Sequence, residues 1–223
     1  MKAKVLLPLT SGVYSQYTRS IPWEGVVASI QKIELHENET TLPTLVGGLT
    51  ALNLSGLSHY LAMGSKARVS LYSNKPLPAW LKRLSLPIEF EANSSASLWN
   101  EGVLRDEAFV RLHHWAPGLP PIQLSCPEKA TLEVLMGVPK SLSFEHADQL
   151  MQGLINLSPR QLDRLLKGCK SVKVKRLFLW LAYRQGYSWF DKLNLKDYEL
   201  GSGKRSIAMP GKLDSDSLIT VPN

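Results

Sequence analysis

The stretch Gly168-Cys-Lys-Ser-Val-Lys-Val-Lys-Arg-Leu-Phe-Leu-Trp-Leu-Ala-Tyr-Arg-Gln-Gly186 combines the strongest helical pattern of the sequence with its densest positive charge. Apolar residues at i, i+3, i+4 and i+7 define one face of a helix, and these are Val174, Leu177, Phe178 and Leu181. The glycines at both ends are typical of helix boundaries, the second as the residue after the last turn. We therefore expect a core helix here.

A second stripe lies beside the apolar face of this helix. It spans about 80° at 100° per residue and consists of Lys173, Arg176, Trp180 and Arg184. Leu179 and Tyr183 project on a third side. So little purely polar surface indicates a helix that is packed on most sides, with the basic–aromatic stripe at an edge.

Length and composition fit one large domain or two small ones. The chain has 223 residues, and 44% of them are hydrophobic, which is enough for a real core. The sequence has no run of about 18 apolar residues of the kind that spans a membrane, and Pro8 interrupts the short apolar start that a signal peptide would need. The two cysteines, Cys126 and Cys169, form no disulfide framework, which is typical of a reduced cytoplasmic protein.

Positive charge is concentrated near the end of the chain. The net charge is +7, and residues 160–212 contain thirteen lysines and arginines against four acids, so this segment holds all of the excess. Such a field attracts polyanions or acidic proteins. The alternative is a solvated basic face that only keeps the protein soluble, and charge alone does not choose between them.

The first part of the chain predicts a small mixed sheet with short helices. Strands are expected near 4–7, 13–17, 67–72, 88–91, 108–115 and 122–125, and helices from Trp23 to a polar break at 36–41, within 45–60 and at 78–84. Residues 93–100 are predicted to form a loop. The glycine pair Gly47-Gly48 suits either close packing or a phosphate cradle, and packing is favoured because no Lys-Ser/Thr follows it.

After Cys126 the pattern changes to successive helices. We expect them at 127–136, 143–157, 158–167, in the stretch quoted above and at 189–193, before a closing hairpin or strand pair at 204–209 and 218–221. The predicted fold class is α+β: a small mixed, β-rich half followed by a helical half closed by C-terminal strands. The expected division is 1–20 as a wing-like segment, 21–125 as the mixed half and 126–223 as the helical half.

The sequence contains no convincing set of catalytic residues. His113 and His114 are adjacent in a strand and point to opposite faces, so a shared metal ranks below ordinary histidine roles. Cys169 lies among lysines but lacks a placed base, which favours an apolar role. Gly201–Ser206 fails the phosphate-loop pattern because Tyr198 and Arg205 occupy its required positions. We predict no enzyme activity, no metal and no cofactor.

Four motifs in register resemble the AbiEi antitoxin family of type IV toxin–antitoxin (abortive infection) systems. They are Val46-Gly-Gly-Leu-Thr-Ala-Leu52, Ser143-Phe-Glu-His-Ala-Asp148, Ser171-Val-Lys-Val-Lys-Arg-Leu-Phe-Leu-Trp-Leu181 and Leu200-Gly-Ser-Gly-Lys-Arg205, and the resemblance covers residues 13 to 221. It implies a cytoplasmic transcriptional regulator active in phage defence, whose C-terminal domain counteracts a nucleotidyltransferase-like toxin. It also implies an N-terminal winged helix-turn-helix that represses the operon.

The start of the sequence departs from this family pattern. Only about a dozen residues precede Gly12, and no helix-turn-helix can be built from them. We therefore do not expect this chain alone to bind operator DNA, and we expect the antitoxic half to be complete. Whether antitoxin and toxin touch is left open.

The leading hypothesis is thus an antitoxin that presents its C-terminal cations to toxin or nucleic acid. The candidate contact residues are Lys170, Lys173, Lys175, Arg176, Arg184, Lys204 and Arg205. The main alternative is a non-specific nucleic-acid-binding module that uses the same charges together with Trp180. A hydrolase with scattered catalytic residues ranks last.

Overall fold

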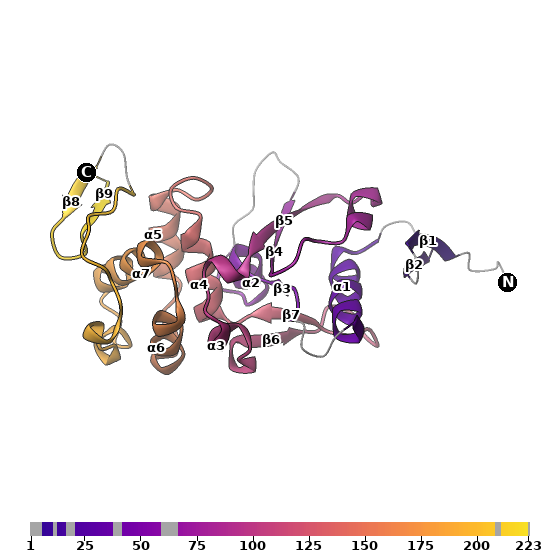
Figure 1. Cartoon of the computed structure of the whole chain (residues 1–223), viewed down its shortest axis with the longest axis horizontal. Helices are drawn as coiled ribbons and strands as arrows, with labels where there is room; N and C mark the ends of the chain where they lie inside the picture. Colours follow the sequence, from indigo (N-terminus) through magenta and orange to yellow (C-terminus); the bar gives the residue numbers. More distant parts are fainter. Residues whose placement is uncertain are drawn as a thin grey trace.

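The computed structural model describes residues 6–10, 13–16, 21–37, 42–58, 67–207 and 211–222. The chain progresses along the long axis of the molecule, from the hairpin of β1 (Leu6–Thr10) and β2 (Val13–Gln16) at one end to β8 (Lys212–Asp214) and β9 (Ile219–Val221) at the other (Figure 1). A mixed sheet with its helices lies next to the first hairpin, and a group of helices follows. The predicted α+β class is confirmed.

The central sheet has five strands in the order β5-β4-β3-β7-β6. The strands are β3 (Leu45–Val46), β4 (Ala67–Ser73), β5 (Ile88–Ser94), β6 (Val110–His113) and β7 (Ile122–Ser125). β4 pairs with β5 and β3 with β7 in parallel, while β3–β4 and β6–β7 are antiparallel. The sheet is therefore mixed, as predicted.

Helix α1 (Trp23–Glu37) packs on the sheet through its predicted apolar face. Val27 joins the main core, while Val26 and Ile30 form a small cluster with Trp80 of the 3₁₀ turn η1 (Ala79–Arg83). Gln31 fixes the register of helix and sheet, because its side-chain amide accepts from the Gln123 backbone N–H at 2.9 Å and donates to the Gln123 carbonyl at 3.0 Å.

Several short elements differ from the sequence prediction. Residues 93–100 are not a simple loop, since β5 continues to Ser94 and is followed by the 3₁₀ turn η2 (Ser95–Ser97). Helix α3 (Glu101–Leu104) and the turn η3 (Glu107–Phe109) precede β6. Short polar turns of this kind carry no apolar periodicity, which is why the sequence pattern does not reveal them.

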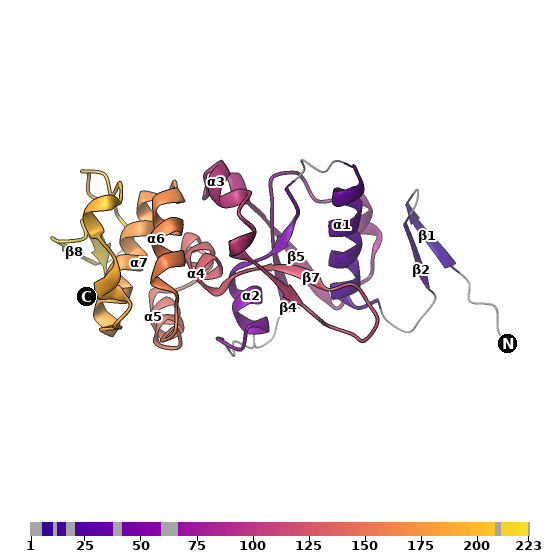
Figure 2. The same cartoon turned by 90° about the horizontal axis from the view of Figure 1, so that it is seen from below.

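The helical half contains α4 (Pro127–Met136), α5 (Phe144–Gln152), α6 (Pro159–Gly168) and α7 (Val172–Gln185), then the turns η4 (Phe190–Lys192) and η5 (Leu195–Asp197) (Figure 2). Serine side chains cap the start of two of these helices: Ser143 accepts from the His146 N–H and Ser158 from the Gln161 N–H. The expected strand at 204–209 is reduced to a bridge from Arg205 to Ile219, and residues 208–209 lie outside the described ranges.

Helix α4 joins the two halves. It contacts α2 (Gly48–Leu54) and β7 on one side and α6 and α7 on the other, and eight of its ten residues are buried. One continuous hydrophobic core runs from the sheet through α4 to α7 and includes residues of both halves, among them Val46, Leu71, Leu132 and Leu177. The packing of the helical half therefore depends on the sheet.

A short seam also ties the halves together. Residues 98–100, which follow β5, pair with residues 168–170 between α6 and α7. The Asn100 N–H donates to the Gly168 carbonyl at 2.9 Å and the Lys170 N–H to the Leu98 carbonyl at 2.8 Å, so that Trp99 and Cys169 form an isolated antiparallel bridge. The seam ends directly before Ser171, the N-cap residue of α7.

Candidate contact surface of the helical half

Helix α7 positions most of the predicted contact residues. Ser171 accepts a hydrogen bond from the Val174 N–H at its start, and Gly186 ends the helix in the left-handed region at φ 65°. The predicted apolar face is confirmed, because Val174, Leu177, Phe178 and Leu181 are fully buried. Leu179, expected beside Tyr183 on a third side, is buried as well, whereas Tyr183 is 72% exposed.

Arg176 is an interior residue and not a surface contact. Its side chain is only 2% exposed, and its guanidinium donates to four carbonyls: Leu200 at 2.7 Å, Gly201 at 2.7 Å, Gly203 at 2.6 Å and Leu218 at 3.1 Å. Burial and the nearby charge of Arg205 lower the pKa of Arg176 below its ordinary value. Arg176 thus clamps the C-terminal tail onto α7, and the sequence-based assignment to the contact surface is corrected.

Lys173 is also occupied within the fold. Its ammonium donates to the carbonyls of Met136 at 2.8 Å and Val138 at 2.7 Å, at the C-terminal end of α4. A cation there satisfies carbonyls that have no partner in the helix and complements the helix dipole. Desolvation, with a smaller effect from Lys140, lowers the pKa of Lys173. The side chain therefore links α7 to α4 instead of standing free.

Lys175 is 4% exposed, so it is buried and not a surface contact. Its charge lies close enough to the buried thiol of Cys169 to oppose the effect of burial, which still raises the pKa of Cys169 to about 11. Cys169 is therefore a protonated, buried thiol, as the apolar interpretation predicts. Lys170 is exposed, and its ammonium donates to the Ala96 carbonyl at 3.0 Å across the seam.

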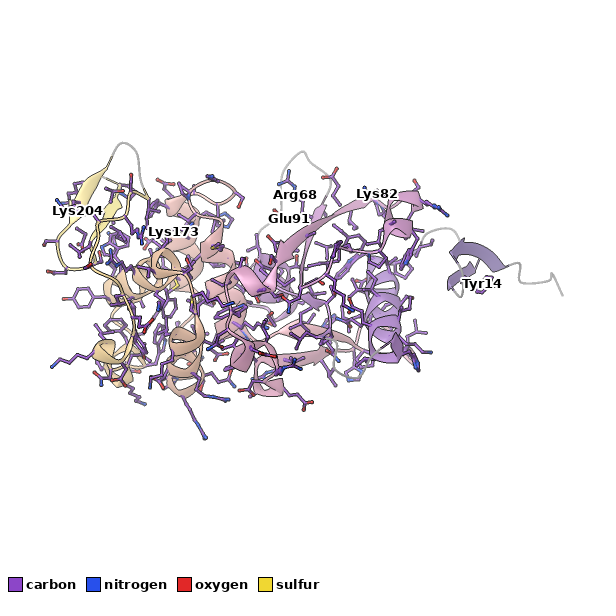
Figure 3. All side chains as sticks on the ribbon, viewed as in Figure 1. Tyr14, Arg68, Lys82, Glu91, Lys173 and Lys204 are labelled. Atoms are coloured by element: carbon purple, nitrogen blue, oxygen red, sulfur yellow. The ribbon has the colours of Figure 1, made fainter. Side chains whose placement is uncertain are left out.

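Three predicted contact residues remain with their charged groups toward solvent: Arg184, Lys204 and Arg205. Within the described part of the chain Lys204 and Arg205 make no ion pair. They follow directly on Gly203, whose carbonyl Arg176 holds, so the clamp sets the direction of this basic turn. Figure 3 shows Lys204 at the outer end of the helical half. We call Lys204 and Arg205 the basic turn.

Trp180 is not an open stacking platform. The Arg184 guanidinium lies 4.6 Å from the centre of the Trp180 ring, and Phe144 meets that ring edge-on with centroids 6.3 Å apart. Most of the Trp180 side chain is thus already covered. The nucleic-acid alternative loses the aromatic residue on which it relies, because base stacking requires a free ring face.

Tyr183 is an exposed aromatic residue that the sequence places on a third side of the helix and does not count among the contact residues. Its ring touches Phe190 with centroids 5.9 Å apart. The helical spacing could have indicated this exposure, since at 100° per residue Tyr183 lies within about 60° of Trp180, which belongs to the basic–aromatic stripe of α7. The sequence could not show that the tail covers Arg176 and stops short of Tyr183.

Among the residues that the structure describes, the most deeply buried charged group is Glu133 of α4, which is 1% exposed. Its carboxylate accepts from the Gly48 N–H at 3.0 Å, from the Ser125 hydroxyl at 3.0 Å and from the Trp99 indole at 3.4 Å. A Cβ on Gly47 would lie 2.4 Å from the carboxylate, so Gly47-Gly48 is closely packed against an internal acid. The packing interpretation of the glycine pair is confirmed.

No group of three or more histidine, cysteine or acidic side chains that could hold a metal ion occurs among the residues that the structure describes. None of the helices in those residues is long and apolar enough to cross a membrane. The candidate contact surface thus consists of the exposed Tyr183 and the basic turn, which follows a Gly203 carbonyl that is hydrogen-bonded to the buried Arg176 guanidinium.

Comparisons with known proteins give the family and a similar fold. Residues 66–222 match the model of a family described as transcriptional regulator, AbiEi antitoxin, type IV TA system. The fold is similar to the crystal structure of the RV2827C protein from Mycobacterium tuberculosis, with a TM-score of 0.56 and 17% identity over 96% of this chain and 74% of that one. No curated protein matches the chain.

Proposed function

Because this chain belongs to the AbiEi family of transcriptional regulators and antitoxins of type IV toxin–antitoxin systems, we propose that it is the antitoxin of such a system and counteracts a nucleotidyltransferase-like toxin. On this proposal the chain is not itself an enzyme and needs no cofactor. The observation that carries it is the family match, which spans the helical half, the Arg176 clamp and the basic turn.

We assign the protective contact to the basic turn. Lys204 and Arg205 are exposed, and the carbonyls of Leu200, Gly201 and Gly203 that precede them are held by the buried Arg176 guanidinium. A turn fixed in this way loses little conformational entropy when a partner binds. Its charges also add to the positive field of residues 160–212, which steers acidic surfaces toward this end of the molecule.

The test is a growth assay in cells that express a nucleotidyltransferase-like toxin of a type IV system together with this chain. Wild type should restore growth, and the double variant K204E/R205E should restore at least about tenfold fewer colonies, since charge reversal opposes encounter with an acidic surface. The proposed function fails if wild type gives no protection.

A matched control distinguishes the position of the reversed charges from their effect on the net charge. Lys82 and Arg83 are also an adjacent, exposed basic pair, and they lie in the sheet half, far from Lys204 (Figure 3). K82E/R83E changes the net charge by the same amount and should protect like wild type. Equal loss in both variants would show that net charge, and not the basic turn, is what matters.

The nucleic-acid alternative predicts a different result. A module that binds through phosphates loses affinity steeply as salt rises. A mobility-shift experiment with duplex and single-stranded probes at low salt would show a K204E/R205E-sensitive complex if this alternative holds. Absence of any shift by wild type at low salt eliminates it.

A further inference from the structure

Strand β5 is an open edge of the central sheet. It is the outermost strand in the order β5-β4-β3-β7-β6, and no other described strand pairs with its outer side (Figure 1). All seven of its residues, Ile88–Ser94, pair with β4 in one uninterrupted register, and none of them is proline. Proteins protect exposed edges with short strands, bulges, prolines, charges or a covering element. Of these devices, the described residues of β5 show only charges.

The pairing register determines which backbone groups of β5 are free. On the β3 side of β4, the Ser70 carbonyl accepts from the Gly47 N–H, so the next residue, Leu71, turns its N–H and carbonyl toward β5. Leu71 lies opposite Ala92, and in a parallel ladder its groups bond to the residues on either side of Ala92. The N–H and carbonyl groups of Phe90 and Ala92 therefore point away from β4. No described group outside β5 is hydrogen-bonded to them.

The two faces of β5 differ in chemistry. Phe90 is half-buried and packs against the apolar cluster that contains Trp80. Glu89 and Glu91 lie on the opposite face, two residues apart, and both are exposed. Arg68 of β4 lines one hollow with these residues, yet neither glutamate forms an ion pair with Arg68 or with any other described residue. Two unpaired carboxylates thus flank the free backbone groups of Phe90.

These glutamates oppose pairing of β5 with a second copy of itself. An antiparallel register centred on Phe90 would set Glu89 of each strand directly opposite Glu91 of the other, and a register centred on Glu91 would set two copies of Glu91 opposite each other. Like charges in directly opposite positions destabilise a strand pair. A strand with two cations, separated by one apolar residue, meets both carboxylates with opposite charge and places the apolar residue on the face of Phe90.

We propose that β5 binds an extended segment of another protein by strand addition, and that this segment alternates basic and apolar residues. The segment runs antiparallel to β5 and bonds to the free N–H and carbonyl groups of Phe90 and Ala92, while its cations lie opposite Glu89 and Glu91. The backbone bonds supply affinity, and the glutamates supply selectivity. Glu91 lies in the sheet half, far from Lys204 (Figure 3). The contact therefore goes beyond the proposed function and does not depend on it.

A peptide titration with the full chain tests the proposal. The probe is a capped, fluorescently labelled peptide of sequence Thr-Lys-Val-Lys-Val-Thr. One matched peptide has proline in place of the valine between the lysines, which removes an N–H that the ladder needs. A second has glutamate in place of both lysines. Wild type should bind the lysine peptide saturably and should bind the proline form at least about tenfold more weakly.

Amide exchange measured by NMR distinguishes strand addition from a contact of side chains alone. In the free protein, the amides of Glu91 and Asn93 bond to β4 and should exchange slowly, whereas those of Phe90 and Ala92 should exchange fast. The lysine peptide should slow exchange at Phe90 and Ala92 by about tenfold or more. The glutamate peptide should leave both amides unprotected.

Two variants separate the charges from the backbone. E89K/E91K should weaken binding of the lysine peptide at least about tenfold, because it sets like charges opposite each other. A92P removes an outward N–H, a change that an edge strand tolerates, and should weaken binding to a similar extent although both glutamates remain. E107K/E199K replaces two exposed glutamates outside β5, changes the net charge equally and should bind like wild type. Circular dichroism checks that each variant is folded.

Four results would overturn the proposal. They are wild type that does not bind the lysine peptide, binding that leaves the Phe90 and Ala92 amides unprotected, equal weakening by E107K/E199K and E89K/E91K, and a wild-type dimer in which these amides are already protected without peptide. In the last case a second copy of the chain would occupy the edge.

Discussion

At the scale of single residues, burial of Glu133 makes stability depend on pH. Burial raises the pKa of its carboxyl above the ordinary value of 4.5, and the charge of Lys129 and the hydrogen bonds from Gly48, Ser125 and Trp99 oppose this only in part. The folded state therefore keeps a proton at pH values where the unfolded chain has lost it. The contribution of Glu133 to the free energy of unfolding therefore falls as pH rises through that range.

The variant E133Q removes this titration. We expect the free energy of unfolding of wild type, measured with urea, to decline between its value near pH 4.5 and its value at neutral pH. The curve of E133Q should lack that decline, although its baseline is lower because an amide cannot accept all three hydrogen bonds. E199Q, at an exposed glutamate, is the control and should follow wild type. Parallel curves for wild type and E133Q would contradict the prediction.

Residue types alone could not separate structural cations from free ones. Lys173, Arg176 and Arg184 share one stripe of α7, yet Lys173 caps α4, Arg176 clamps the tail and only Arg184 keeps its charge toward solvent. A helical wheel gives the direction of a side chain but not what packs over it. Lys204 and Arg205 are exposed, as a position in a glycine-rich turn indicates, because little can cover side chains there.

At the scale of elements, the tail is held to α7 by the Arg176 clamp. R176A would leave four carbonyls without their charged donor and should lower the free energy of unfolding by about 2–4 kcal/mol. R176K keeps the charge but cannot fork to four acceptors, so we expect most of the same loss.

Hydrogen exchange locates the effect of R176K. The amides of Arg205 and Thr220 donate to the carbonyls of Leu218 and Arg205, and both should exchange much faster in R176K. The Lys170 amide in the seam should keep its protection. R184K, at an exposed arginine of the same helix, should leave all three amides unchanged. Unchanged exchange at Arg205 and Thr220 in R176K would show that Arg176 does not hold the tail.

The sequence predicts elements best where a local signal marks them. Serine caps and the glycine at 186 mark the helices, and alternating apolar residues mark β4 and β7. Strand β3 has only two residues, Leu45 and Val46, and its neighbours β4 and β7 are distant in sequence. Strand order depends on such long-range pairing, so the sequence indicates a mixed sheet but not its arrangement.

At the scale of the whole molecule, the core is continuous through α4, and the seam joins residues 98–100 to 168–170. We therefore predict a single cooperative unfolding transition. Circular dichroism, which reports on the helices, and tryptophan fluorescence should give the same urea midpoint. Labelling of the buried thiols of Cys126 and Cys169 should follow that midpoint too. Two separated transitions would show that residues 21–125 and 126–223 fold independently.

The division into these two halves stays a prediction until that measurement is made. So does the expectation that this chain alone does not bind operator DNA. Membership of the AbiEi family is established by the match over residues 66–222. Residue roles do not follow from membership, since they depend on which side chains the fold leaves exposed.

The Arg176 clamp has a consequence for genetics. On the proposed function, a selection for cells that lose protection from the toxin would recover substitutions at Arg176 beside those at Lys204 and Arg205, because all of them disturb the same turn. Their causes differ. Alleles at Arg176 act through the stability and abundance of the protein, so overexpression or growth at low temperature should suppress them, whereas alleles of the basic turn should resist both.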